Sequence, residues 1–237
     1  MAQIYDHIMR HVEYDRWARY VSRIIRNFLE IQLRLLDVGC GTGKLIRELA
    51  KIGIQADGCD PCEQMLEIAK KSHPDSHFWK DRLPALERVA PQQYSMITCL
   101  YDTINYLPSL QEVEETLQRM NQVLPPKGLF VFDAVSAELC QYYFHQASEK
   151  EVLSKDYAYS RHSYFDRNSS LQINEFIIYT PRGVFEEKHV QKIFAFSDIR
   201  SVILAEDSFE LLGVFDGFTF CDATEDSNRA HFILKKK

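Results

Sequence analysis

Three glycines at alternate positions, directly after a short apolar stretch, are the most informative feature of the sequence. The segment reads Leu35-Leu36-Asp37-Val38-Gly39-Cys40-Gly41-Thr42-Gly43-Lys44, and a helix-like segment follows it at once. Glycine lets the chain adopt positive φ and approach a ligand closely, and the free N–H groups that begin the next helix then face that ligand. The pattern predicts a nucleotide-type loop at the carboxyl end of a first parallel strand.

Two common nucleotide-binding motifs do not fit this loop. The dinucleotide fingerprint Gly-x-Gly-x-x-Gly would need a glycine where Lys44 stands, and the P-loop would need a hydroxyl residue where Leu45 stands. The run D-V-G-C-G-T-G instead resembles motif I of the class I S-adenosylmethionine-dependent methyltransferases. That resemblance implies a Rossmann-like fold, S-adenosyl-L-methionine as the cofactor and methyl transfer as the activity.

The composition is that of an ordinary globular protein with an acidic balance. The chain has 237 residues, 46% of them hydrophobic and 26% charged, and a formal net charge of −6. This charge argues against a general nucleic-acid groove, although a local basic patch stays open. No apolar run approaches the length of a membrane span, and residues 1–11 lack the apolar core of a secretory signal. We expect a cytoplasmic protein that needs no membrane and no nucleic acid and that could form a homodimer.

The six cysteines lie mostly in predicted strands or at strand ends, as expected of small buried residues in a reducing cytosol. Two of them form Cys59-x-x-Cys62, which invites a metal or redox interpretation. No second cysteine or histidine pair stands nearby at ligand spacing, so we expect a structural role for the pair and no metal site.

Alternating strand and helix patterns predict an α/β core with a doubly wound, mostly parallel seven-stranded sheet. Two helical segments come first, and the second has one buried face that includes Trp17 and Ile24. The expected core strands are Leu35–Val38, Gln55–Cys59, His77–Trp79, Tyr94–Leu100 and Leu129–Asp133, with a final pair Glu210–Phe215 and His231–Leu234. The expected helices between them are Leu45–Ile52, Glu63–Lys71, Gln111–Leu124 and, later, Ser197–Glu206.

The alternation breaks after Ser136. We expect a short helix over Leu139–Ala147 and then three strands rich in aromatic and β-branched residues, Tyr157–Phe165, Leu171–Tyr179 and Val184–Phe196. The prediction is a cofactor-binding core of residues 1–136 and 197–237, with residues 137–196 inserted as an antiparallel β lid that binds the substrate.

The resemblance assigns separate parts of the cofactor to separate residues. Asp60 stands about 20 residues after the glycine loop, where such folds place a carboxylate for the ribose hydroxyls; capping the next helix is the alternative role. Met65 resembles the apolar residue that packs on adenine, and Asp81 with the backbone of Arg82 resembles the adenine-amine site; a plain surface loop is the alternative for Asp81. The sulfonium favours aromatic surroundings. The expected cofactor contacts are Tyr14, Trp17, Asp37, Gly39, Cys40, Gly41, Gly43, Asp60, Pro61, Met65, Asp81, Arg82, Leu100 and Tyr101.

The acceptor is expected between the core and the lid. Tyr101 and Asn105 would form the core wall, and His189 would share a lid strand face with Glu187 and Gln191 because strand neighbours alternate. His162 beside Tyr164 is a second possible base and His145 a third; a solvated strand face is the alternative for His162 and His189. We predict His189, Tyr101 and Asn105 as the catalytic residues.

The resemblance extends to bacterial small-molecule N- and O-methyltransferases. The chain lacks the Asn/Asp-Pro-Pro-Tyr/Phe signature of many enzymes that methylate planar amines in nucleic acid or protein. We therefore expect methyl transfer to an amine or hydroxyl of a small molecule. The alternatives are a tRNA-directed transferase and a catalytically silent cofactor-binding protein.

Overall fold

The computed structural model describes residues 1–144 and 146–237. A mostly parallel sheet forms the centre of the molecule. Its strands lie in the order β10 (Phe209–Asp216), β11 (Arg229–Lys236), β5 (Leu129–Val135), β4 (Met96–Cys99), β1 (Leu35–Val38), β2 (Ala56–Asp60) and β3 (Phe78–Lys80). Strand β11 runs antiparallel to both of its neighbours. The strand order reverses between β1 and β4, where open α/β sheets bind ligands at the carboxyl ends of their strands. The predicted fold class is confirmed.

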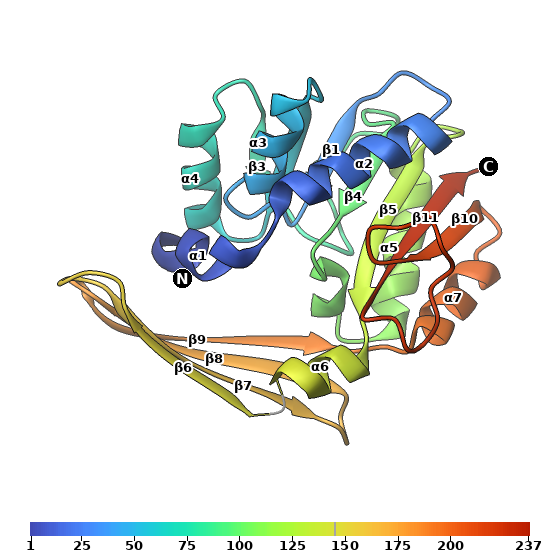
Figure 1. Ribbon diagram of the computed structural model, residues 1–237. Coiled ribbons are helices and arrows are strands. Elements are labelled where there is room, and N and C mark those ends of the chain that lie inside the picture. The colour runs from blue at the N-terminus through green and yellow to red at the C-terminus, as the bar shows by residue number, and fades with distance from the viewer. Residues whose placement is uncertain (145) are drawn as a thin grey trace.

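Helices cover both faces of this sheet (Figure 1). One apolar cluster joins the sheet to α2 (Tyr14–Phe28), α3 (Lys44–Lys51) and α4 (Glu63–Ser72), and a second joins it to α5 (Leu110–Val123) and α7 (Phe196–Ala205). Strand β1 is buried at all four positions, as expected for a parallel strand covered on both sides. Helix α5 begins at a capping residue, because the Ser109 hydroxyl accepts a hydrogen bond from the Glu112 N–H at 3.3 Å.

A separate four-stranded antiparallel sheet follows β5 and α6 (Ala137–Phe144). It occupies the segment predicted to be a lid and is called the lid below; that it covers a substrate stays a prediction. Its strands are β6 (Ala147–Val152), β7 (Ala158–Asp166), β8 (Leu171–Thr180) and β9 (Gly183–Lys192), hydrogen-bonded in that order. Figure 1 shows this curved sheet beneath the core, attached at the end where α6 lies. The short 3-10 turn η2 (Thr103–Tyr106) also contacts the sheet, through the hydrogen bond from Asn105 to the Lys192 carbonyl.

The lid has one strand more than the sequence analysis predicts. The expected helix over Leu139–Ala147 is wrong at its end, because α6 ends at Phe144 and Ala147 already pairs with Ser163 of β7. The segment Ala-Ser-Glu-Lys-Glu-Val has little intrinsic strand preference, so pairing with β7 decides its conformation. His145 lies outside the described residues.

Helix α1 (Ala2–Ile8), continued by the 3-10 turn η1 (Met9–His11), joins the core to the free end of the lid (Figure 1). On the core side, Asp6 accepts a hydrogen bond from the Thr42 hydroxyl at 2.6 Å and pairs with Lys44 at 3.1 Å. On the lid side, Ile4 and Ile8 pack against an apolar cluster that contains Tyr159, Phe176 and Ile178. The helix therefore closes the space between the glycine loop and the lid.

Within the described ranges, no helix combines the length and the apolar character needed to cross a membrane.

Candidate active site

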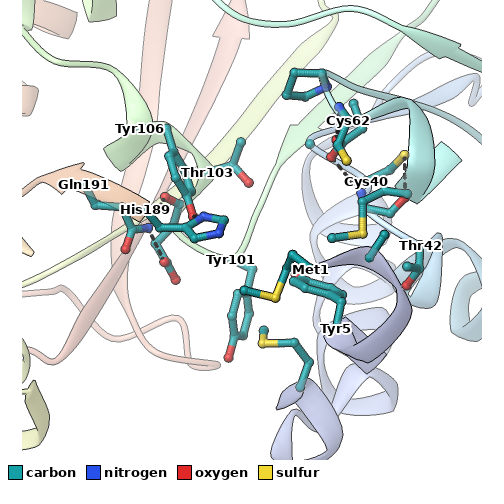
Figure 2. Close-up of a pocket in the computed structure, with 18 of the residues that line it drawn as sticks. Met1, Tyr5, Cys40, Thr42, Cys62, Tyr101, Thr103, Tyr106, His189 and Gln191 are labelled. Atoms are coloured by element: carbon teal, nitrogen blue, oxygen red, sulfur yellow. Dashed lines mark hydrogen bonds between the residues drawn. The ribbon is translucent and has the colours of Figure 1, made fainter. Parts of the chain in front are cut away.

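One large cavity lies between the glycine loop, helix α1 and the inner face of the lid. Its volume is about 1890 Å³. Its core wall comes from the carboxyl ends of β1, β2 and β4, and its lid wall comes from alternate residues of β8 and β9. Figure 2 shows Tyr106, His189 and Gln191 on one side of this space, and Cys40, Thr42 and Cys62 on the other.

The glycine loop is held in a left-handed conformation above the sheet. Gly39, Gly41 and Gly43 have φ of +76°, +55° and +78°, where an L side chain is strained. A Cβ on Gly39 would lie 2.5 Å from the Thr103 side chain, whereas a Cβ on Gly41 would meet only the Tyr5 ring, at 3.7 Å. Gly39 is therefore required by packing, and Gly41 leaves the front of the loop open to a ligand.

Asp60, the last residue of β2, faces the same cavity and supports the loop. Its Oδ2 accepts a hydrogen bond from the Gly41 N–H at 3.0 Å, and its Oδ1 accepts one from the Cys62 N–H at 2.8 Å. Burial raises the pKa of this carboxyl. Because a carboxylate oxygen can accept two hydrogen bonds, each oxygen keeps one acceptor position for a ligand hydroxyl. The side chain thus anchors the start of α4 and remains able to bind a diol.

Asp37 is a second buried carboxyl at the loop. It is 4% exposed, and its Oδ1 accepts a hydrogen bond from the Thr98 hydroxyl at 2.8 Å. Burial raises the pKa of Asp37 to about 7. A cation in the cavity would favour its ionised form.

Aromatic rings surround the middle of the cavity. The ring centroid of Tyr101 lies 5.6 Å from that of Trp17 and 6.5 Å from that of Tyr14. Burial raises the pKa of Tyr14 to about 12, so this ring is neutral at physiological pH. Tyr5 of α1 completes the group (Figure 2). The faces of such rings attract cations.

A buried charge network fixes the turn after β4. Tyr101 and Asp102 have φ of +60° and +53°, which is strained for residues other than glycine. Arg229 of β11 donates to Asp102 Oδ1 at 2.8 Å and to Asp133 Oδ2. Gln191 of the lid donates to Asp102 Oδ2 at 2.6 Å. The turn that carries Tyr101 is thus held by residues from β5, β11 and β9.

Comparison with known proteins assigns the chain to a family. A family model described as a methyltransferase domain matches residues 5–182. The chain belongs to the methyltransferases. A methyltransferase relative from Geobacillus sp. (strain WCH70) is 30% identical over 98% of this chain and 96% of its own length. The dTDP-3-amino-3,6-dideoxy-α-D-glucopyranose N,N-dimethyltransferase of Streptomyces fradiae is 30% identical over 56% of this chain and 52% of its own length. The crystal structure of an S-adenosylmethionine-dependent methyltransferase from Clostridium acetobutylicum has a TM-score of 0.81 at 20% identity, covering 99% of this chain and 97% of that one.

The protein is thus a methyltransferase. The residues that line its cavity fit S-adenosylmethionine, the cofactor that the sequence predicts. The space in front of Gly41 suits the amino acid part of the cofactor. The Asp60 carboxylate has acceptor positions for the ribose hydroxyls. The aromatic rings around Tyr101 suit the sulfonium. Most of the predicted cofactor contacts line the cavity; these are Tyr14, Trp17, Asp37, Gly39, Cys40, Gly41, Asp60, Pro61, Met65, Arg82, Leu100 and Tyr101. That they touch the cofactor stays a prediction.

Two predicted cofactor contacts do not line the cavity. Gly43 closes the loop, since its N–H donates to the Cys40 carbonyl at 2.9 Å and a Cβ there would lie 2.9 Å from His73. Asp81 accepts from the backbone N–H groups of residues 82, 87 and 88 and from the Trp79 ring N–H, at 2.9 to 3.4 Å. These four donors fill the acceptor positions of its carboxylate, so the structure gives Asp81 a loop-organising role.

His189 lies in the lid wall, on one face with Glu187 and Gln191 as predicted. Its Nδ1 is 3.1 Å from the Tyr106 hydroxyl, and its Nε2 is 3.6 Å from a Glu187 oxygen. That Nε2 is buried and has no hydrogen-bond partner in the part of the chain that the structure describes. Burial lowers the pKa of His189, although Glu187, which also contacts the Met1 amino group, opposes this shift. The imidazole is therefore neutral near pH 7. In the tautomer whose Nδ1–H donates to the Tyr106 hydroxyl, Nε2 carries no hydrogen and is able to accept a proton.

The structure corrects the predicted set of catalytic residues at Asn105. This residue is fully buried and does not line the cavity. Its Nδ2 donates to the Lys192 carbonyl at 2.9 Å, and its Oδ1 accepts from the Val135 N–H at 3.3 Å. The expectation that it forms the acceptor wall is wrong, because its amide joins η2 to the lid and to β5. His162 does not line the cavity either, and its exposed ring bonds Ser148 at 3.0 Å, so the solvated alternative holds for it.

The structure adds residues that the sequence analysis missed, chiefly Tyr5, Asp102 and Arg229. It also gives Cys59 a buried place in β2 and Cys62 a place at the start of α4. Across the described residues, no three His, Cys, Asp or Glu side chains are grouped as a metal site would require.

Proposed function

We propose that the enzyme methylates a nitrogen or oxygen of a small molecule held between the core and the lid. The observation that carries this proposal is the position of His189, which lines the same cavity as the glycine loop and Asp60 and whose buried Nε2 has no hydrogen-bond partner among the described residues. The Streptomyces fradiae relative is named for an amino-sugar acceptor, which supports an acceptor of this size.

The bound cofactor supplies a methyl group made electrophilic by its positive sulfur. The residues of the chain align the two reactants, which is the main contribution that an enzyme makes to a displacement of this kind. Asp60 and the glycine loop would hold the donor, and the Tyr101 ring on the cavity wall would supply aromatic surroundings for its charged end.

His189 would remove the proton that the acceptor must lose. An alkyl ammonium has no lone pair until it is deprotonated, and a hydroxyl gains nucleophilicity when a base accepts its proton. The neutral imidazole offers Nε2 for this purpose, while Tyr106 holds the opposite ring nitrogen at 3.1 Å. The nearby Glu187 carboxylate would stabilise the imidazolium that results.

A small acceptor suits the charge of the protein better than tRNA does. The net charge is −6, and the cavity wall carries side chains of both signs, such as Lys71 and Arg82 beside Glu67 and Glu112. Sites for nucleic acid gather positive charge on one surface.

A panel of acceptors tests the proposal. The purified protein is incubated with S-adenosylmethionine and single amines, hydroxy acids or sugar nucleotides, including dTDP-3-amino-3,6-dideoxy-α-D-glucopyranose, and release of S-adenosylhomocysteine is measured. We expect acceptor-dependent release and a product heavier by one methyl group, both absent with Gly41→Val. Release that depends on added tRNA and on none of the small acceptors would refute the proposal.

A further inference from the structure

The inner face of the lid carries two side-chain amides beside His189. Gln172 and Asn174 of β8 both line the cavity, and because they are two residues apart they lie on the same face of the strand. In the sheet register, Asn174 lies opposite His189 and Gln172 lies opposite Gln191. The next residue of β8 on this face is Phe176, which is buried, so the polar area ends there.

Gln172 holds an acceptor atom without a partner. The residue is only 2% exposed, and its Oε1 is buried and receives no hydrogen bond from residues 1–144 or 146–237. Its Nε2 donates to the Ile173 carbonyl at 3.3 Å. A buried acceptor without a partner destabilises the protein, because it has lost its hydrogen bonds to water. On the wall of a ligand cavity, such an atom is suited to accept a hydrogen bond from the ligand.

Asn174 offers the complementary group. Its Oδ1 accepts a hydrogen bond from the fully buried Ser163 hydroxyl at 2.6 Å, which fixes the orientation of the amide. None of the hydrogen bonds found among the described residues uses its Nδ2. The lid wall therefore presents an acceptor on Gln172 and a donor on Asn174 side by side.

We propose that Gln172 and Asn174 bind a hydroxyl group of the acceptor, next to the nitrogen or oxygen that is methylated. A hydroxyl donates and accepts at once, so a single one can serve both amides. Directly paired residues of an antiparallel sheet have Cβ atoms about 4.5–5.5 Å apart, so a molecule whose hydroxyl meets Asn174 places its neighbouring group at His189. The acceptor class is a small amino alcohol or diol. This inference rests on the proposed function, since it assumes an acceptor at His189.

Two amines that differ by one hydroxyl test this inference, trans-2-aminocyclohexanol and cyclohexylamine. We expect the wild-type enzyme to favour the amino alcohol by at least about tenfold in kcat/KM, because the analogue leaves both amides unpaired. Gln172→Met keeps the side-chain length and removes the polar atoms; it should abolish the preference and leave cofactor affinity unchanged. Glu175→Gln, on the opposite face of the same strand, is the matched control and should keep the preference.

Thermal unfolding of the acceptor-free proteins gives a readout that needs no turnover. Because the Gln172 oxygen is unpaired, Gln172→Met should unfold at the wild-type temperature or above it. A melting temperature several degrees lower would mean that a protein group also pairs with the amide oxygen, and the inference would fail. Equal use of both amines by the wild type, or an intact preference in Gln172→Met, would also overturn it while leaving the proposed function standing. A protein that methylates neither these two amines nor any acceptor of the panel counts against the proposed function, and the melting temperature still decides the role of Gln172.

Discussion

Removal of the Asp60 carboxylate should weaken cofactor binding more than it weakens the fold. In the structure this side chain accepts one backbone N–H at Gly41 and one at Cys62, and it keeps two acceptor positions toward the cavity. Loss of the bonds to the ribose hydroxyls in Asp60→Ala should cost about 1–3 kcal/mol of binding free energy, which is roughly a 5- to 150-fold rise in Kd. The two backbone N–H groups left without an acceptor should also lower the melting temperature by a few degrees.

The control separates these two effects. Asp57 stands on the same strand and also accepts two hydrogen bonds, from the His77 N–H at 2.9 Å and the Tyr94 hydroxyl at 2.7 Å, but it does not line this cavity. Asp57→Ala should therefore lose a similar amount of stability and keep its cofactor affinity. Isothermal titration with S-adenosylmethionine and S-adenosylhomocysteine measures both variants, and thermal unfolding measures their stability. A Kd for Asp60→Ala within twofold of the wild type, in a folded protein, would refute the ribose assignment.

Three further perturbations test other parts of the site. Gly41→Val should abolish cofactor binding in a folded protein, because φ of +55° strains any side chain there; normal affinity by titration would contradict this. Burial raises the pKa of Asp37 to about 7, so the stability that its neutral form contributes is present below about pH 4 and is lost as the pH rises to about 7. Affinity for a cationic cofactor should rise as Asp37 ionises toward pH 7. Asp37→Asn should flatten both profiles in urea unfolding and in titration, and an unchanged pH dependence would exclude Asp37 as their source. His189→Ala should lower turnover while cofactor affinity stays nearly constant. It should also remove the fall in rate that the wild type shows as the pH drops below the lowered pKa of His189. A variant with a higher Kd for the cofactor and unchanged acceptor selectivity would place His189 elsewhere.

The part of the site that is local in sequence could be predicted. The strand, the three glycines and the acidic residue at the end of β2 follow one another within 26 residues, 35–60, and each position is set by backbone conformation or by strand ends. The side-chain period of two likewise placed Glu187, His189 and Gln191 on one lid face.

The remaining features depend on contacts between distant segments. Arg229 meets Asp102 across 127 positions, and Asn105 meets the Lys192 carbonyl across 87, and no local pattern encodes either pair. Asn105 follows Tyr101 in a polar and aromatic run, so no local pattern predicts that its amide turns into the protein interior. Gln172 and Asn174 did carry a signal, because polar residues alternate with Leu171 and Ile173, but the sequence does not reveal which face of the strand meets the core.

Transfer of a labelled methyl group into separated cell fractions tests the central claim most directly. The purified enzyme is given methyl-labelled S-adenosylmethionine together with the small-molecule, RNA or protein fraction of a cell extract, and incorporated label is counted in each, with Gly41→Val as the blank. We predict that the label enters the small-molecule fraction, in compounds that carry an amine or hydroxyl. Label that enters RNA or protein and leaves the small molecules unlabelled would contradict the account.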